Sequence, residues 1–337
     1  MFTIRQTRAS GGYDMEAVVE PLPLIAPDEV LIEIAYAGFN RADTAQRRGL
    51  YPSPQGESEA MGLECSGEIL EVGADVEHWR AGDRVCALLG GGGYASHVAA
   101  PASQLLPLPA EASLATAAGL PEVCSTIWCS LIAPGLIRPN TWMLLQGASG
   151  GIGAATLAVC RHEGMNVVAL AHGAEKIAAC YEGGAATVID YRSGTVRDEI
   201  RHRRPQGFDV QLNVLGPVTY EDAVLHASAG GVIVALGVQL GRVGELSMSE
   251  FMRKRLTLHG ANLRHRPRYG PGSKAEVVAG ARAYFWPRFD HSEIPLPDVT
   301  VYDITEVNTV HRLSESGDLP PGKIVFRVGR DSIDVGP

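Results

Sequence analysis

The pattern of hydrophobic and polar residues changes about one third of the way along the chain. Before that point, short stretches alternate apolar and polar positions and are separated by glycine and proline. Val30–Tyr36 alternates in this way, which places Val30, Ile32, Ile34 and Tyr36 on one face of a strand. Further short strands are expected at Glu68–Val72, Arg84–Leu88 and Tyr94–Val98. Many short strands that end in Gly/Pro turns predict a barrel-like β domain.

The middle of the chain alternates apolar strand patterns with helical patterns. Short helices are expected at Ser113–Gly119 and Val123–Leu131, and six strands are expected at residues 142–146, 166–171, 187–190, 209–214, 231–236 and 256–260. Helical runs such as Ala174–Cys180 and Tyr220–His226 lie between them. Continuous apolar strands such as Val167–Ala171 are expected where helices cover both faces of a sheet. Six strand–helix units predict a doubly wound parallel sheet with a ligand crevice at the carboxyl ends of its strands.

The last part of the chain returns to a mixed pattern. Lys274–Phe285 and Ile304–Leu313 read as helices, and Val299–Asp303 reads as a strand. Gly322–Val328 is expected to be a final strand that closes the first domain, followed by a loose tail.

A glycine-rich turn follows the first strand of the predicted parallel sheet. The run Trp142–Ala154 reads strand, tight turn, helix, with glycines at 147, 150, 151 and 153. A dinucleotide-binding βαβ unit needs this order, because the backbone must approach a pyrophosphate and point free helix N–H groups at it. Ala148 stands where the first glycine of GxGxxG is usual. The turn therefore predicts a nucleotide site, with Ser149, Gly150, Gly151, Ile152 and Gly153 as its contacts.

Composition narrows the class of protein. The chain has 337 residues, 45% hydrophobic and 20% charged, and a formal net charge of −9, which describes a globular protein of about two domains and argues against nucleic acid as a partner. The N-terminus lacks the apolar core of a secretory signal, and no run approaches the ~18 apolar residues of a membrane-spanning helix. The six cysteines form no CxxC pair, which favours reduced thiols and a cytoplasmic location.

Several motifs occur together in one order along the chain. They are Gly38–Asp43, Gln46–Pro52, Gly62–Gly67, Ala81–Leu89, Leu120–Glu122, Thr126, Trp128, Gly150–Gly153, Arg253–Leu258, Leu263–Arg264 and Gly322–Val325. This combination resembles the zinc-independent quinone oxidoreductase (zeta-crystallin-like) branch of the medium-chain dehydrogenase/reductase superfamily. It is most similar to the tumour-suppressor-inducible type of NADPH:quinone oxidoreductase.

The resemblance implies an α/β protein with a six-stranded Rossmann domain and a GroES-like β-barrel catalytic domain. The catalytic domain is expected to begin with residues 1–121 and to resume over 264–330, after an NADPH-binding domain at 122–263. Residues 331–337 would form the tail. The resemblance also implies a homodimer, for which an edge strand around Leu256–Leu258 offers a pairing surface.

Zinc-dependent relatives hold a catalytic metal with a cysteine, a His-Glu pair and a third ligand. The corresponding positions here are Asn40 and Leu63-Glu64, which supply neither a thiolate nor an imidazole, so no metal is expected. Cys65 lies next to the lost ligand position and reads either as a small hydrophobic strand residue or as a remnant of that site.

The residues after the second strand favour NADPH over NADH. NAD enzymes usually place an acidic residue about 20 residues beyond the turn, whereas His172 and Gly173 stand there in this chain. Lys176 suits a 2′-phosphate, although a solvated helix lysine is the alternative. In related quinone reductases, a lysine and a tyrosine at the positions of Lys176 and Tyr191 contact this phosphate, and Arg192 offers a further charge.

Other cofactor contacts are expected at the carboxyl ends of later strands and from the family motifs. They are Asn40, Thr126, Gly173, Asn213, Leu215, Leu236, Gly237, Val238, Leu263, Arg264 and Lys323. Asn213 reads equally as a satisfied core amide, and Thr126 as a plain helix threonine. Relatives usually carry Asp at Asn213 and glycine at Pro217, which suggests a modified loop.

Catalysis without a metal requires an acceptor that is already activated, such as a quinone or an enone. Tyr51, in a loop before Pro52, is the best donor to the oxygen that gains charge, and a turn-packing aromatic is its alternative reading. Asn40 is the second candidate, because relatives contact nicotinamide or substrate there. The basic segment at 264–274 lacks interleaved aromatics beyond Tyr269 and is expected to be a loop that reshapes the substrate mouth.

The leading hypothesis is therefore an NADPH-dependent quinone or enone reductase. A dedicated enoyl reductase of a biosynthetic pathway is the second hypothesis, because Pro217 and the 264–274 loop are unusual. An NADPH-binding structural or regulatory protein with little catalysis is the third.

Overall fold

Each of the two units into which the chain divides contains one main sheet. A computed structural model describes residues 1–9 and 12–329, so the predicted tail at 331–337 lies outside the described residues. Unit 1 comprises Met1–Ser125, Leu263–Ser292 and the chain from Leu296 onward, and unit 2 comprises Thr126–Asn262 with Glu293–Pro295. These divisions lie close to the expected boundaries after residues 121 and 263, which we retain as a proposal for the domains.

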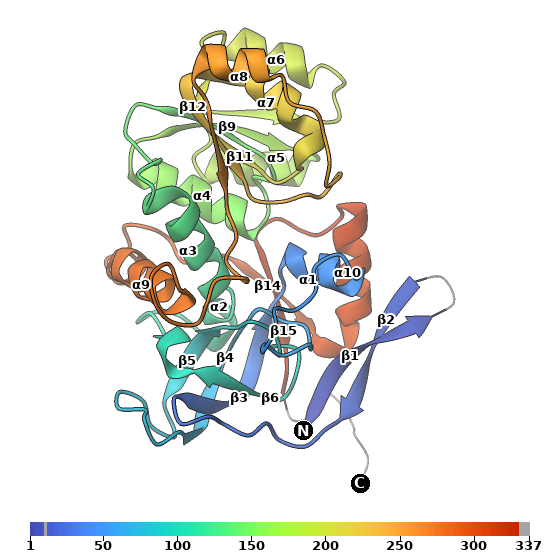
Figure 1. Cartoon of the computed structure of the whole chain (residues 1–337), viewed down its shortest axis with the longest axis vertical. Coiled ribbons are helices and arrows are strands. Elements are labelled where there is room, and N and C mark those ends of the chain that lie inside the picture. The colour runs from blue at the N-terminus through green and yellow to red at the C-terminus, as the bar shows by residue number, and fades with distance from the viewer. Residues whose placement is uncertain (10–11, 330–337) are drawn as a thin grey trace. The chain divides into compact units, whose positions relative to one another are not determined.

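Unit 2 contains the predicted six-stranded parallel sheet. Its strand order is β10 (Thr187–Asp190), β9 (Asn166–Ala171), β8 (Trp142–Leu145), β11 (Phe208–Asn213), β12 (Ala227–Ala235), β13 (Thr257–Gly260) (Figure 1). All five pairings are parallel. Five of these strands are four to six residues long and β12 has nine. The predicted α/β class and Rossmann sheet are confirmed.

Helices connect successive strands of this sheet. They are α4 (Gly151–His162), α5 (Ala174–Glu182), α6 (Val196–Arg203), α7 (Tyr220–His226) and α8 (Met248–Lys254). Since parallel crossovers are right-handed, the reversal of strand order after β10 puts α4 and α5 on one face and the later helices on the other. The reversal leaves a switch point between β8 and β11, where such sheets bind ligands.

The main sheet of unit 1 is mixed and has seven strands. Along it run β14 (Val299–Asp303), β15 (Lys323–Arg327), β3 (Glu29–Gly38), β4 (Glu64–Val72), β5 (Arg84–Leu88) and β7 (Leu105–Pro107), and β6 (His97–Pro101) also pairs with β3. A separate hairpin consists of β1 (Phe2–Ala9) and β2 (Gly12–Val19). The hairpin, β7, α6 and α8 carry little periodicity and were not anticipated.

The helices of unit 1 lie at its edges in the chain order. They are α1 (Arg41–Arg47), α2 (Leu114–Ala117), α9 (Lys274–Asp290) and α10 (Val307–Ser316), and α3 (Pro121–Ile127) leads into a π-helical turn at Trp128–Ile132. Within residues 1–9 and 12–329, no helix combines the length and the apolar character needed to cross a lipid bilayer.

Two local strand predictions needed correction. Bulges in β3 shift its register between Ile34 and Tyr36, so that Ala37, and not Tyr36, continues the buried face. The strand expected at Tyr94–Val98 begins instead at His97. Tyr94 is fully buried, and its carbonyl accepts a hydrogen bond from the N–H of Ile4 in the hairpin.

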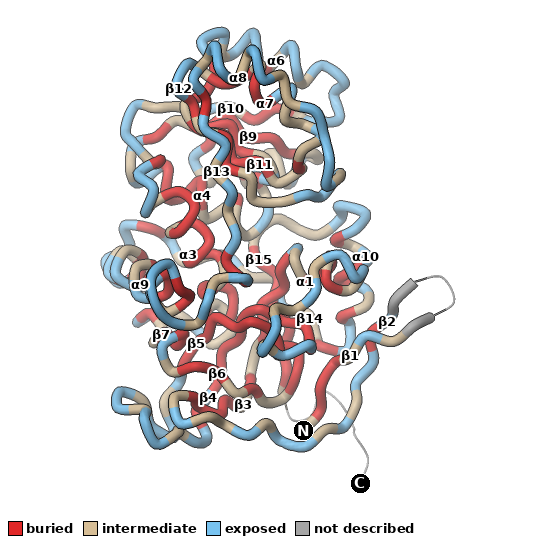
Figure 2. Tube along the Cα trace, viewed as in Figure 1, coloured by how far each residue is buried: buried red, intermediate tan, exposed pale blue. Residues whose placement is uncertain are grey.

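The largest apolar cluster lies in unit 1, between the hairpin, the mixed sheet and α10 (Figure 2). His311 of α10 is enclosed in it, with the Phe39 ring 5.1 Å and the Tyr94 ring 6.2 Å away between centroids. Neither imidazole nitrogen has a hydrogen-bond partner among the described residues. Burial, followed by the charge of Arg47, lowers the pKa of His311 to about 3.

Candidate functional site

The turn between β8 and α4 forms the nucleotide side of the candidate site in unit 2. Gly147 adopts φ +65°, so the positive-φ turn comes one residue before Ala148, which is buried. Half-buried Ser149 then leads to Gly150, the residue that caps α4. The N–H groups of Gly151 and Ile152 lie in the first turn and have no intrahelical acceptor, as an anion site requires.

Gly150 and Gly153 have different steric environments. A Cβ on Gly153 would overlap the carbonyl oxygen of Gly147 and approach Ala148 backbone atoms to 2.6 Å, so only glycine fits. A Cβ on Gly150 would meet nothing in the chain closer than 3.7 Å. The turn therefore needs Gly153 for its own packing and keeps open space at Gly150, which suits the close approach of a pyrophosphate.

The end of β9 carries the residues expected to select the cofactor. Gly173 has φ +91° and precedes the first turn of α5, which contains the half-buried Lys176. Opposite, the Nδ1 atom of His172 lies 2.9 Å from Oδ1 of Asp190, and the Tyr191 and His172 ring centroids are 5.7 Å apart. The sequence reading missed this Asp190 carboxylate because it comes from the neighbouring strand.

The loops after β11 and β12 are tied to each other at the same edge of the sheet. The Asn213 amide donates to Thr219 Oγ1 at 2.8 Å and accepts from the Gly216 N–H at 2.8 Å, so both of its polar atoms serve the loop. Leu240 N–H donates to Leu215 O, and Leu236 N–H donates to Asn213 O. A Cβ on Gly237 would approach Val214 carbonyl oxygen to 2.5 Å, and Val238 after it is exposed.

Thr126 lies in α3 and is 3% exposed. Its carbonyl oxygen accepts from the Ser130 hydroxyl at 2.5 Å, at the start of the π-helical turn. The threonine is thus held in the last turn of a helix whose hydrogen bonding is about to change, a geometry that recurs at functional sites.

Asn40 is the centre of a buried polar cluster in unit 1. Its Nδ2 donates to Glu64 Oε1 at 2.8 Å, and its Oδ1 accepts from Lys323 Nζ at 2.7 Å. Lys323 Nζ also contacts Glu64 Oε1 at 2.6 Å and Phe39 O at 2.9 Å, while Glu64 Oε2 accepts from the Glu122 N–H. The Glu64 carboxylate and the Lys323 ammonium are both taken from water and satisfy each other.

Asp43 fixes the backbone on the other side of Asn40. Its Oδ2 accepts from the Asn40 N–H at 2.8 Å and from the Tyr94 hydroxyl at 3.0 Å, and its Oδ1 accepts from the Gly62 N–H. Burial raises the pKa of Asp43 to about 6, and these three hydrogen bonds oppose that rise. Asn40 is thereby held as the N-cap of α1 in a reciprocal capping box.

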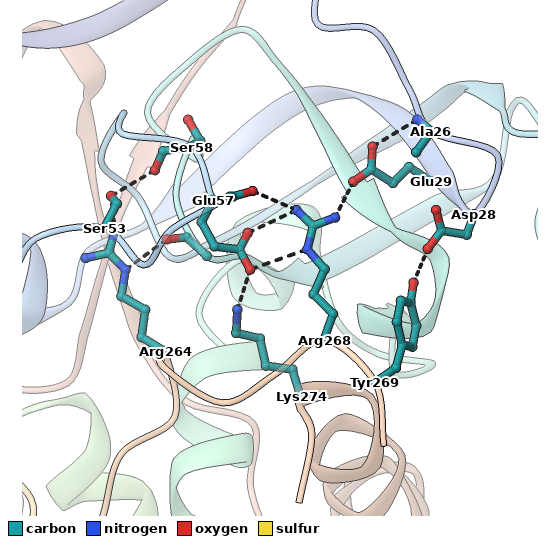
Figure 3. Close-up of polar contacts among 12 residues, drawn as sticks. Ala26, Asp28, Glu29, Ser53, Glu57, Ser58, Arg264, Arg268, Tyr269 and Lys274 are labelled. Atoms are coloured by element: carbon teal, nitrogen blue, oxygen red, sulfur yellow. Dashed lines mark hydrogen bonds and ion pairs between the residues drawn. The ribbon is translucent and has the colours of Figure 1, made fainter. Parts of the chain in front are cut away.

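Tyr51 lies in the loop after α1, against the segment that begins at Leu263. The Arg264 guanidinium donates to Tyr51 O at 3.3 Å, to Ser53 Oγ at 2.8 Å and to Gly90 O at 2.8 Å (Figure 3). The same group lies 5.3 Å from the Tyr51 ring centroid, and the His265 ring meets the Tyr51 ring edge-on at 5.2 Å. Arg264 is 3% exposed and Leu263 6%, so the guanidinium positions the Tyr51 loop; a cofactor contact for both residues stays a prediction.

The remaining cations of the 264–274 segment form an ion-pair network with unit 1. Glu57 receives Lys274 at 2.6 Å and Arg268 at 3.2 Å, and Arg268 continues to Glu29 at 2.8 Å (Figure 3). Next to it, Tyr269 donates to Asp28. The hydrogen bonds from Lys274 and Arg268 lower the pKa of Glu57 against the effect of its burial. The segment is thus a paired strap on the loop that contains Tyr51.

The position at which zinc-dependent relatives bind metal is expected at Asn40, Leu63 and Glu64. Leu63 is buried, and the Cys65 thiol points into the core, where burial raises its pKa far above the usual range. Across the described part of the chain, no group of three or more His, Cys, Asp or Glu residues is placed to hold a metal ion. Cys65 therefore behaves as a hydrophobic strand residue.

The sequence was compared with known families and proteins. A family model described as "Alcohol dehydrogenase GroES-like domain" matches residues 26–110, and one described as "Zinc-binding dehydrogenase" matches residues 151–274. These two matches cover parts of unit 1 and of unit 2 respectively.

Curated relatives match most of the chain at moderate identity. "Synaptic vesicle membrane protein VAT-1 homolog" of Danio rerio is 32% identical over 208 residues, which is 61% of this chain and 43% of the relative. The rat, mouse and human homologs are covered over 52 to 53% of their length, so the chain spans about half of these relatives. "Quinone oxidoreductase-like protein 2" of Rattus norvegicus is 28% identical over 72% of this chain and 69% of its own.

Solved structures share the fold over almost the whole chain. The structure of Escherichia coli quinone oxidoreductase complexed with NADPH has a TM-score of 0.84 at 24% identity, covering 96% of this chain and all of that one. CurK enoyl reductase has a TM-score of 0.80 at 22% identity, covering 97% of this chain and 99% of its own. At these identities the likeness establishes the fold.

Proposed function

Because the chain belongs to the zinc-independent quinone oxidoreductase branch of the medium-chain dehydrogenase/reductase superfamily, we propose that it is an NADPH-dependent reductase of quinones or α,β-unsaturated carbonyl compounds. The observation that carries the proposal is the Lys323 ammonium, 2.6 Å from Glu64 and 2.7 Å from Asn40. A fixed cation there opposes a divalent metal by charge repulsion. Reduction must then use an acceptor that is activated without a metal.

The groups in unit 2 fit the parts of NADPH. The open space at Gly150 and the free N–H groups at the start of α4 suit the pyrophosphate. Lys176 and Tyr191 suit the 2′-phosphate beside the adenosine ribose. When bound, NADPH supplies a hydride, and the chain's own residues orient the acceptor and stabilise its developing charge.

Tyr51 and Asn40 are the proposed groups toward the acceptor and the nicotinamide. The Tyr51 phenol donates a hydrogen bond to the oxygen that becomes negative as hydride arrives, and this oxygen then takes a proton from solvent. Asn40 uses one Nδ2 hydrogen on Glu64 and keeps the second for the nicotinamide amide or the substrate carbonyl. Its orientation is fixed by Lys323, so it is pre-organised.

The activity is tested by incubating the pure protein with NADPH and a panel of quinones and enones while the absorbance of reduced nicotinamide is followed. Oxidation of NADPH that depends on the acceptor is expected with at least one compound. Tight NADPH binding without oxidation across the panel would favour a structural or regulatory protein over a reductase.

A dedicated enoyl reductase is the second candidate. It is favoured by the strap at 264–274, which is anchored by Lys274, 1% exposed, and holds the Tyr51 loop in one position. A rigid acceptor loop suits one substrate better than a range of quinones. Turnover with one class of enone and none with quinones would select this candidate.

We also propose a cytoplasmic homodimer. The strand β13 is an edge of the parallel sheet, and its Leu258 is 41% exposed. Pairing of two such edges would continue the sheet across the dimer. Sedimentation analysis of the wild type beside Thr257→Pro tests this, because proline removes an edge N–H donor; an unchanged dimer would place the interface elsewhere.

A further inference from the structure

A histidine and an aspartate form a polar pair at the end of β9 that the proposed mechanism does not yet use. His172 Nδ1 lies 2.9 Å from Asp190 Oδ1 and 3.2 Å from its Oδ2. The N–H of Arg192 donates to the same Oδ1 at 2.9 Å. The second imidazole nitrogen, Nε2, has no hydrogen bond within residues 1–9 and 12–329, and the side chain is 35% exposed.

The pair lies where a Rossmann sheet binds the adenosine ribose, at the carboxyl end of the second strand. Ala171 is in register with Asp190, and the Tyr191 N–H donates to Ala171 O at 3.2 Å. His172 is therefore held between the end of β10 and the start of α5, in whose first turn Lys176 stands.

We propose that His172, oriented by Asp190, is a specificity-determining residue that donates its Nε2–H to the 2′-phosphate of the dinucleotide. The inference rests on the proposed function, since it concerns the same nucleotide site. It adds a residue to that site and assigns Asp190 a role opposite to that of the acid in NAD enzymes.

The role of Asp190 follows from its partners. In NAD enzymes an acid near this strand end accepts hydrogen bonds from the ribose hydroxyls. Here its Oδ1 is taken by the Arg192 N–H and by His172, and these contacts lower the pKa of Asp190. The carboxylate consequently stays ionised and keeps a hydrogen on Nδ1, which directs Nε2 away from Asp190.

The protonation state of His172 then decides what Nε2 can bind. With a hydrogen only on Nδ1, Nε2 is an acceptor and does not bond to a phosphate; with both nitrogens protonated it donates to one. The charged groups around it are Asp190, Lys176, Glu175 and Arg192, together with the Tyr191 phenol. Of these, only the imidazole has an ordinary pKa within the range of pH 6 to 8.

Binding of NADPH should therefore take up a proton at His172, whereas binding of NADH should not. The expected result is a preference for NADPH over NADH that weakens by up to tenfold for each pH unit above about 6.5. The 2′-phosphate titrates near pH 6, so the useful window is pH 6.5 to 8.

The experiment measures the Kd of NADPH and of NADH by fluorescence titration from pH 6.5 to 8, with wild type, His172→Gln, His172→Arg and Lys176→Ala. The Gln variant should lose NADPH preference at low pH and show a flat profile. The Arg variant should restore the preference and stay flat. Lys176→Ala should lower the preference at every pH with the wild-type slope, and serves as the matched control.

Parallel pH profiles in wild type and His172→Gln would overturn the role of His172 and leave the proposed function intact. Equal loss of NADPH and NADH binding in His172→Gln would also overturn it, since that result means a general structural role. Failure of the wild type to bind either dinucleotide would overturn the proposed function and this inference with it. Calorimetric proton uptake for NADPH in two buffers provides the independent readout.

Discussion

Lys323 and Glu64 form an ion pair of 2.6 Å between side chains that are 4% and 0% exposed. Every hydrogen of the ammonium has an acceptor, in Glu64, Asn40 and the Phe39 carbonyl. Such a pair is costly to break from one side only, because the remaining charge stays buried without compensation. The pair therefore fixes both the charge and the geometry around Asn40.

Replacing Lys323 by methionine should destabilise the protein by about 3–5 kcal/mol. The double variant Lys323→Met/Glu64→Gln should recover a large part of this loss, since it removes both charges and leaves an amide that still accepts from Glu122 N–H. Urea unfolding of the three proteins measures the coupling. Additive losses in the double variant would contradict the pairing.

Two glycines of the α4 turn should respond differently to alanine. Gly153→Ala should lower the free energy of unfolding by about 1–3 kcal/mol, because the new methyl overlaps backbone. Gly150→Ala should change stability by less than about 1 kcal/mol, yet weaken NADPH binding about tenfold or more by filling the space in front of the helix. Unfolding curves and cofactor titrations on both variants separate the two roles; unchanged affinity in Gly150→Ala would move the pyrophosphate elsewhere.

His311 should make the fold sensitive to acid. Its pKa is about 3 when folded, below the unfolded value of about 6.5, so its contribution to stability is present above pH 6.5 and is lost as the pH falls toward 3. Between pH 7 and pH 5 the expected loss is about 2 kcal/mol. Asp43, whose pKa is raised to about 6, acts in the opposite sense over its own range.

The His311 contribution is isolated by comparing wild type with His311→Phe. The difference in unfolding free energy between the two proteins should shift toward the Phe variant as the pH falls, while the effect of Asp43 cancels. Denaturant unfolding at several values between pH 5 and 7.5 provides the measurement. A pH-independent difference would show that His311 does not titrate as its burial requires.

Tyr51→Phe should lower kcat by about 10²–10³-fold, because it removes a donor to the developing oxyanion. The Kd for NADPH should not change. Tyr269→Phe is the matched control, since its hydroxyl is bonded to Asp28 and its loss should leave kcat near that of the wild type. Equal rates in wild type and Tyr51→Phe would assign the role of donor to another group.

Much of the fold could be predicted because periodicity reports burial. The strands of unit 2 are short and apolar, and five of the six begin within one residue of their predicted starts; β12 begins four residues early, at Ala227. Unit 1 was less predictable, since the β1–β2 hairpin alternates charged and small residues that carry no clear pattern. The β3 bulges, which depend on pairing with β4, leave no trace in the sequence of β3 alone.

The candidate site was predictable where one segment carries the chemistry. The α4 turn is of this kind, since spacing alone indicated Gly150 and Gly153. Partners that come from distant segments could not be found in this way. Lys323 reaches Asn40 across 283 residues and Asp190 reaches His172 from the next strand, so only the folded chain shows that these charges meet.

The paired strap at 264–274 has a consequence for protein engineering. Its cations Lys274 and Arg268 meet Glu57, more than two hundred residues earlier in the chain. A chimera that imports the acceptor loop of a relative without this strap would leave two cations facing no carboxylate. Substrate range in this scaffold is therefore inherited as a two-segment cassette, and only joint transplantation of residues 51–58 and 264–274 is expected to transfer it.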